Sequence, residues 1–264
     1  MMRQKPGLKL ERSPLQLVLI QVRFSPVTAM RDYVPPFQEK LRKSGFPRFN
    51  EEKIQKVTLG AEEPEIESTT RWCFVSREKH EAVVLTRDFV VYETTRYNIF
   101  ESFTERFKEV LSELNAVADI NFAAQIGLRY VDVVHSLDGH RPDWFIRDQF
   151  HGLSAEGIGE PITNQFLSVV KTAEGILKLK TLDGHGPGFM PPDLEATGLD
   201  FDLELTEQDP FRILDFDHIW KGEIDFVPDD IIEKMWALHG SVEKTFRSTV
   251  TEDAMKVWES KGAE

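Results

Sequence analysis

Acidic side chains alternate with apolar ones in two nearby segments, and this pattern is the strongest chemical signal in the sequence. It runs through residues 199–206 and again through residues 213–220, with a linker short enough for a hairpin. Successive side chains of a β-strand point to opposite faces, so pairing these two segments would bring their carboxylates onto one face. The carboxylates concerned are Asp200, Asp202, Glu204, Asp215 and Asp217.

This acidic face has two interpretations. Hard cations take carboxylate oxygens as ligands, so the five residues would hold Mg²⁺ or Mn²⁺ in a metal-dependent hydrolase or phosphotransfer enzyme. In that enzyme Arg129 or the basic N-terminal residues would clamp a phosphorylated substrate. Alternating polar residues are more often the solvated side of a sheet or a surface for a basic partner. We favour this second interpretation, under which no cofactor is expected.

Basic residues form a second candidate site, for an anion or an acidic partner. Its members are Lys40, Arg42, Lys43 and Arg48, together with Arg129. The chain as a whole is acidic, with 32 Lys and Arg against 45 Asp and Glu and a formal net charge of −13. Nucleic-acid-binding domains are typically basic, so we do not expect this protein to bind duplex nucleic acid.

Histidine and cysteine lack the spacing of known catalytic and metal sites. His135, His140 and His151 form no HExxH or His–Cys pattern, so we expect no zinc site. His239 falls on the apolar stripe of an expected helix, which predicts a hydrogen-bonded residue of the core or of an interface. Cys73 is the single cysteine; it alternates with aromatic residues in an expected strand and is predicted to be buried.

Composition predicts an ordinary cytoplasmic globular protein. Hydrophobic residues make up 41% and charged residues 29% of the 264 residues. The longest apolar stretch, residues 15–24, is much shorter than the ~20 residues that a membrane span requires. We find no secretory signal pattern and expect no association with a membrane.

The elements that would position these residues follow one order twice: a strand, a short helix, three or four strands and a long helix. Period-two patterns predict strands and 3–4 spacing predicts helices. Asn98 and Glu101 have the spacing of a capping box, and Thr251 is expected to cap the last helix. Residues 62–67 are expected to form a loop. The expected strands are 15–24, 54–59, 71–76, 82–86, 89–94, 122–135, 166–172, 176–182, 199–206 and 213–220, and the expected helices are 33–43, 100–114, 143–150 and 228–246.

This repeated order predicts an α+β fold. Two β-α-β-β-β(-β)-α half-units would join into a mainly antiparallel sheet with long helices on one face, as in helix-grip and TATA-binding-protein-like folds. We expect one structural domain, in which a mobile basic arm (1–12) precedes the first half-unit (13–118) and the second (119–264). The uncovered concave face of the sheet would be the natural place for a ligand or a partner.

Several short motifs resemble those of a sporadically distributed, uncharacterised bacterial protein family. They are Ser13-Pro14 with Leu17-Val18-Leu19 and Val22-Arg23-Phe24, then Gly127-Leu128-Arg129-Tyr130-Val131-Asp132, Leu214-Asp215-Phe216-Asp217, Leu238-His239, Phe246 and Val250-Thr251. The resemblance implies no activity, because none is established for the family. Its sporadic occurrence is typical of accessory and mobile genes, such as defence or toxin-linked loci. Asp132 stands where the resemblance leads us to expect Asn, which puts a ligand role for that position in doubt.

Two functions therefore remain open. We favour a non-catalytic protein-binding or accessory module that meets a protein partner through its charged surfaces, and a homo-oligomer is compatible with this interpretation. The alternative is the metal-dependent enzyme that uses the acidic strand pair.

Overall fold

The computed structural model describes residues 8–59, 64–153, 157–159, 162–194 and 197–260. The strands are β1 (Leu15–Phe24), β2 (Arg48–Leu59), β3 (Pro64–Val75), β4 (Glu81–Leu85), β5 (Phe89–Thr94), β6 (Phe122–His135), β7 (Gln165–Lys171), β8 (Ile176–His185) and β9 (Pro210–Asp225). The helices are α1 (Met30–Lys43), α2 (Phe100–Ala118), α3 (Pro228–Thr249) and α4 (Glu252–Glu259), with short 3₁₀ turns η1 (Pro142–Phe145) and η2 (Asp148–Phe150).

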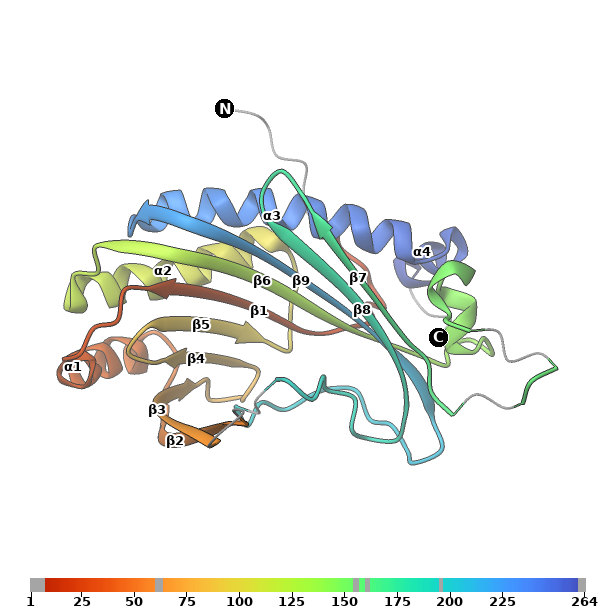
Figure 1. Ribbon diagram of the computed structural model, residues 1–264, viewed down its shortest axis with the longest axis horizontal. Helices are drawn as coiled ribbons and strands as arrows, with labels where there is room; N and C mark the ends of the chain where they lie inside the picture. The colour runs from red at the N-terminus through yellow and green to blue at the C-terminus, as the bar shows by residue number, and fades with distance from the viewer. Residues whose placement is uncertain (1–7, 60–63, 154–156, 160–161, 195–196, 261–264) are drawn as a thin grey trace.

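The nine strands form one antiparallel sheet in the order β2-β3-β4-β5-β1-β6-β9-β8-β7 (Figure 1). β1 and β6 pair at its centre, with Val18 opposite Tyr130. The apolar character of both faces of β1 is explained by this central position, because each face is covered by other parts of the chain. The prediction of an α+β fold with a mainly antiparallel sheet is confirmed.

Helices α2 and α3 lie along one face of the curved sheet (Figure 1). The stripe predicted for α2, which includes Phe103, Phe107 and Leu111, is buried against the sheet. On α3, Met235 and Val242 are likewise buried in the core between the helix and the sheet. Burying such a stripe contributes about 1.5–3 kcal/mol for each large apolar side chain, so packing rather than helix propensity holds these helices in place.

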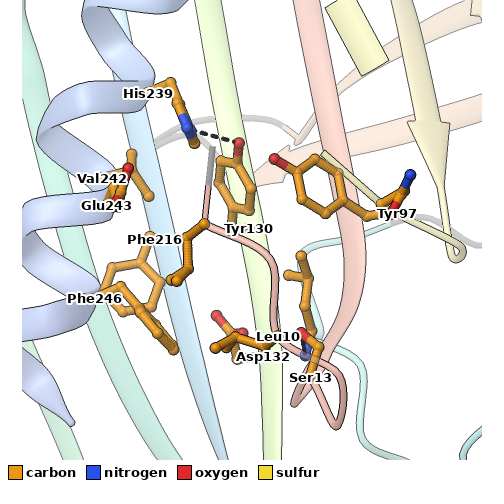
Figure 2. Close-up of a pocket in the computed structure, with 13 residues that line it drawn as sticks. Leu10, Ser13, Tyr97, Tyr130, Asp132, Phe216, His239, Val242, Glu243 and Phe246 are labelled. Carbon is orange, nitrogen blue, oxygen red and sulfur yellow. Dashed lines mark hydrogen bonds between the residues drawn. The ribbon is translucent and has the colours of Figure 1, made fainter. Parts of the chain in front are cut away.

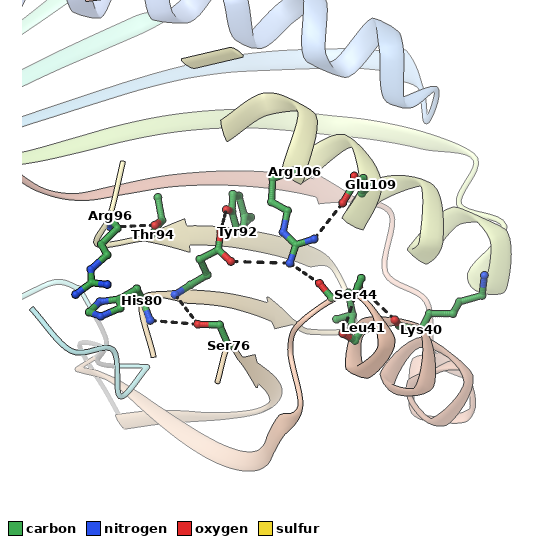
Figure 3. Close-up of polar contacts among 11 residues, drawn as sticks. Lys40, Leu41, Ser44, Ser76, His80, Tyr92, Thr94, Arg96, Arg106 and Glu109 are labelled. Atoms are coloured by element: carbon green, nitrogen blue, oxygen red, sulfur yellow. Dashed lines mark hydrogen bonds and ion pairs between the residues drawn. The ribbon is translucent and has the colours of Figure 1, made fainter. Parts of the chain in front are cut away.

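Arg106 of α2 ties the first helices to the sheet (Figure 3). Its guanidinium donates to the backbone carbonyl of Ser44 at the end of α1, and it lies 3.9 Å from the Glu81 carboxylate on β4. That carboxylate in turn accepts a 2.6 Å hydrogen bond from the Tyr92 hydroxyl. Gly45, next in the chain, has a φ of +102°, a conformation in which a side chain would be strained.

Part of the opposite, concave face is covered by a long connection that we call the strap, residues 186–194 and 197–209 (Figure 1). Its apolar side chains, among them Phe189 and Phe201, pack on Val131 of β6 and Ile213 of β9. The expectation that this face is uncovered is therefore wrong for the centre of the sheet.

Residues 199–206 are not a strand, which corrects the prediction made from their alternating pattern. Leu199, Phe201, Leu203 and Leu205 are partly buried against the sheet, while Asp200, Asp202 and Glu204 are exposed. An extended segment that lies on a sheet has the same alternation as a strand within one, although it forms no ladder. The period of two was therefore real, but its structural origin was different.

Other predicted boundaries also change. Helix α1 begins at Met30, so Pro35 and Pro36 lie inside it, where burial of Val34 and Phe37 compensates for the missing N–H donors. Pro64–Val75 is a strand, so residues 64–67 of the expected acidic loop belong to β3, and residues 62–63 lie outside the described residues. The expected helix 143–150 is the pair of 3₁₀ turns η1 and η2.

Only one of the two predicted caps forms. Thr251 accepts a hydrogen bond from the Ala254 N–H and so caps α4 as expected. The N-cap of α2 is Ile99, whose side chain cannot accept a hydrogen bond, so the expected Asn98 capping box is wrong. No helix within the described residues is both long and apolar enough to cross a membrane.

Residues 8–14, the N-terminal segment, run over the helix-covered face before β1 begins. Leu8 and Leu10 pack against the main core. The Arg12 N–H donates to the Trp258 carbonyl at 3.0 Å, and its guanidinium forms a 2.5 Å ion pair with Asp138. The prediction of a mobile arm is therefore wrong for residues 8–12, which pack on and hydrogen-bond to the rest of the protein. Residues 1–7 lie outside the described residues.

Candidate ligand-binding pocket

A pocket lies between α3 and strands β6 and β9, under the N-terminal segment (Figure 2). Its cavity volume is about 70 Å³, enough for several water molecules or a small organic group. Leu10, Phe216, Val242 and Phe246 supply its apolar walls. A few polar side chains converge inside these walls, which is the usual composition of a small-molecule site.

Strand β6 brings two of these polar groups into the pocket. Its residues alternate between the helix-covered and the concave face, so Leu128, Tyr130, Asp132 and Val134 share the helix-covered side. Tyr130 and Asp132 interrupt a row that is otherwise apolar. They face α3 at the level where the N-terminal segment crosses the sheet (Figure 2).

Tyr130 is part of a buried chain of hydrogen bonds. Its hydroxyl lies 2.9 Å from Nδ1 of His239 on α3, and it also interacts with the hydroxyl of Tyr97. Burial raises the pKa of both tyrosines well above the usual value, so both hydroxyls stay protonated at neutral pH. The chain therefore offers neutral donors and acceptors to whatever occupies the pocket.

His239 is a neutral imidazole at neutral pH. Burial lowers its pKa to about 4, and its ring stacks on Phe100 with 3.9 Å between centroids. The prediction that His239 is a hydrogen-bonded core residue is confirmed. Its Nε2 atom is buried and has no hydrogen-bond partner among the described residues. An unpaired buried polar atom lowers the free energy of unfolding by about 1–3 kcal/mol, so His239 in this position destabilises the folded state.

Asp132 is the least expected residue of the pocket. Its exposed fraction is 4%, and it has neither a hydrogen bond nor an ion pair within the part of the chain that the structure describes. Desolvation, and secondarily the charge of Asp215, raises the pKa of Asp132 to about 8. At pH 7 this carboxyl group is therefore mostly protonated, and a positive charge or hydrogen-bond donors in the pocket would stabilise its ionised form.

The charge around the pocket is negative. Among the residues that the structure describes, its lining contains two carboxyl groups, Asp132 and Glu243, and neither lysine nor arginine. Glu243 is 30% exposed and accepts a 3.0 Å ion pair from Arg247 one turn further along α3. Asp132 has no such neutralising neighbour.

The five carboxylates predicted to form a metal site are not brought together. The reason is the strap, which carries Asp200, Asp202 and Glu204 on its solvent side instead of on a strand beside β9. Asp200 lies 3.8 Å from Lys79, and Asp202 pairs with Arg96 at 2.9 Å. Across the described ranges no group of three or more His, Cys, Asp or Glu residues is arranged to hold a metal ion.

Asp215 and Asp217 lie on the concave face of β9, each beside a cation. Arg129 binds both oxygens of Asp215 at 2.7 Å and also pairs with Asp193 of the strap at 2.8 Å. Asp217 lies 3.6 Å from Lys178 on β8. Arg129 thus fastens the strap to the centre of the sheet, and its guanidinium already has two carboxylate partners.

The other predicted anion-binding residues lie far from Arg129. Three of them are on α1, and Arg48 is the first residue of β2, at the edge of the sheet. Lys40 pairs with Glu113 of α2, while Arg42 and Lys43 both pair with Glu39 at 2.9 and 3.1 Å. Arg48 donates to the carbonyl of Arg77 at 3.2 Å. The three α1 cations thus already have acidic partners within the protein.

The three histidines that were weighed as zinc ligands, and the cysteine, contact groups of their own chain. His140 stacks on Trp144 with 3.8 Å between centroids, His151 lies 2.8 Å from the Ile146 carbonyl, and His135 lies 2.9 Å from the Ser136 carbonyl. Cys73 is buried, as predicted.

Sequence reasoning missed the pocket because its polar residues are scattered over three elements. One signal was available: an aspartate two residues after a tyrosine, on a strand face that is otherwise apolar. A charged residue in such a strand must either be paired or lie beside a cavity.

Comparisons with protein-family models, with curated proteins and with solved structures found no match to this chain.

Proposed function

We propose that this protein is a non-catalytic binding module whose ligand occupies the pocket under α3. One observation carries the proposal: the buried carboxyl group of Asp132 lines a cavity and has no partner among the described residues. Buried polar groups in native proteins are nearly always hydrogen-bonded, so an exception beside a cavity is best explained by a partner from outside the chain.

The chemistry of the lining favours binding over catalysis. His239 is tied to Tyr130, and its lowered pKa of about 4 leaves it a weak base. Among the described lining residues only Ser13 has an aliphatic hydroxyl, and its oxygen accepts a hydrogen bond from the Leu15 N–H at 3.2 Å. No base lies against Ser13 in this lining, whereas a catalytic serine requires one.

A matched pair of tryptophan variants, compared with the wild type, tests the proposal. Benzyl alcohol, which is small, neutral and half apolar, should bind the wild type in a ligand-detected NMR titration. Leu10→Trp should abolish this binding, because an indole in the roof would fill the cavity. Leu153→Trp, an exposed change between η2 and β7, is the control and should bind like the wild type. Equal binding of benzyl alcohol by all three proteins would place its binding elsewhere and would exclude the pocket as its site.

The finer fold assignment belongs to the same proposal. We infer that the chain consists of two related half-units with a helix-grip or TATA-binding-protein-like arrangement. The strand order supports this, because each half starts at the centre of the sheet and ends beside its own first strand: outward from the centre the orders are β1-β5-β4-β3-β2 and β6-β9-β8-β7. The second half has the 3₁₀ turns η1 and η2 where the first has helix α1.

The cytoplasmic location, the protein partner and the resemblance to the sporadic bacterial family also stay proposals. The partner proposal draws support from β7, the last strand of the sheet, where Leu167 and Val169 are 58% and 57% exposed. Edge strands usually carry protecting charges, and an apolar edge is suited to pairing with a further strand.

A further inference from the structure

The pocket combines a buried carboxyl group with aromatic walls, and no lysine or arginine lines it among the described residues. Tyr97, Tyr130, Phe216 and Phe246 line it together with Asp132. Aromatic faces attract cations, and a desolvated carboxylate attracts them more strongly. An anionic ligand would meet two carboxyl groups and no cation among the described lining residues. A neutral ligand could form hydrogen bonds with Asp132 but would gain no charge attraction from it.

Resting on the function proposed above, we propose that the ligand is a small organic cation, a primary ammonium group on a short apolar body, with the Asp132 carboxylate as its counter-ion. The ammonium group would donate to Asp132, and the apolar body would lie against Phe216, Phe246 and Val242 (Figure 2). The hydroxyl of Tyr130 is a second acceptor for the three ammonium hydrogens.

Among the described residues, the groups around Asp132 include no cationic side chain that would compete with a ligand cation for its carboxylate. Strand β6 contributes Tyr130, α3 contributes His239 and Glu243, and the segment before α2 contributes Tyr97. Asp215 of β9 adds negative charge from the other face of the sheet. From the N-terminal segment, Arg12 is engaged by Asp138, while Lys9 and Glu11 are exposed.

Binding of such a cation must release a proton. With a pKa of about 8, Asp132 is mostly protonated at pH 7 in the free protein, and an adjacent ammonium group would favour its ionised form. Each binding event at pH 7 therefore releases about one proton to the buffer. At pH 9 the carboxyl group is already ionised and the release disappears.

The test compares benzylamine with benzyl alcohol, which has the same apolar body and no charge. Isothermal titration at pH 7, in two buffers with different ionisation enthalpies, yields both the Kd and the number of protons released. The wild type should bind benzylamine at least tenfold more tightly and release about one proton. Asp132→Asn should lose this preference and the proton release while it still binds benzyl alcohol. Glu243→Gln removes an equal charge from the rim and should change the benzylamine Kd less than threefold.

The outcomes separate the two proposals. If benzyl alcohol binds the wild type and benzylamine binds no better, the pocket is a ligand site but the cation proposal is wrong. If neither compound binds, the proposed function itself is wrong. If Glu243→Gln rather than Asp132→Asn removes the preference, the counter-ion is misassigned. Should Asp132→Asn fail to fold, the comparison of proton release by the wild type at pH 7 and pH 9 decides, since equal release at both values contradicts the proposal.

Discussion

The raised pKa of Asp132 makes the stability of the protein depend on pH in an unusual direction. An aspartate of an unfolded chain has its pKa near 3.8, whereas burial raises the pKa of Asp132 to about 8 in the folded state. Between these values the folded state binds more protons than the unfolded state, so the free energy of unfolding falls as pH rises. This contribution is fully present below pH 3.8 and is lost through pH 8.

The magnitude follows from the linkage relation. Each unit of pH between the two pKa values costs about 1.4 kcal/mol per group. From pH 6.5 to pH 8.5 the folded carboxyl group gives up its proton, which removes about 2 kcal/mol from the stability of the wild type. Asp132→Asn replaces the carboxyl group with an uncharged group of the same shape, so its stability should lack this loss.

Urea unfolding at pH 6.5 and pH 8.5, followed by circular dichroism, measures the difference. Glu93, whose pKa burial raises to about 7, acts in the same direction in both proteins and cancels in the comparison. His239 contributes a fall in stability only below pH 6.5, because its folded pKa of about 4 lies below the unfolded value. Parallel pH profiles for the wild type and Asp132→Asn would refute the assignment of Asp132 as a buried, unpaired carboxyl group.

Three further predictions concern other parts of the sheet. Arg129→Met should destabilise the protein by about 3–5 kcal/mol in urea unfolding, because it leaves Asp215 buried and without its ion-pair partner. The double variant Arg129→Met, Asp215→Leu should recover part of that loss. An unchanged stability of the single variant would contradict this reasoning. Since both oxygens of Asp215 are engaged by Arg129, 5 mM Mg²⁺ or Mn²⁺ should leave the melting temperature unchanged against EDTA, and a rise that Asp215→Asn removes would restore the metal hypothesis. If β7 pairs antiparallel with β7 of a second copy, with Ser168 at the centre of the pairing, Leu167 lies opposite Val169 and no like charges face each other. Any concentration-dependent association seen by sedimentation should therefore weaken in Val169→Lys. An association that survives this change must use another surface.

The sequence predicted the elements of the sheet better than it predicted what lies on its two faces. Strand β6 has the bounds expected from its apolar residues, Phe122–His135, because period two and length together distinguish a long central strand from a helix. The buried stripe of α2 was equally readable, since Phe100, Phe103 and Phe107 recur at helical spacing. These signals are local, and tertiary packing reinforced them.

The strap could not be distinguished from a strand by pattern. Leu199, Phe201 and Leu203 alternate with acids because one side of the segment packs on a sheet, and packing on a sheet imposes the same period as pairing within one. Only long-range partners separate the two cases: Asp200 accepts no ladder hydrogen bonds and its N–H donates to the carbonyl of Lys79 instead. The predicted metal site depended on the hairpin, so it did not form once the segment left the sheet.

The two faces of the sheet explain why the candidate site lies under the helices. On the concave side the strap packs its own apolar residues over the centre, and Arg129 joins Asp215 to Asp193, so the charges there already have partners. On the other side α3 leaves room beside β6 that the N-terminal segment covers without filling. The Asp132 carboxyl group in that space lowers the stability of the protein at neutral and alkaline pH, because it has no partner among the described residues. A residue that lowers stability and pairs with none of the described residues is best explained by what it binds, and for Asp132 we propose that this ligand is a cation.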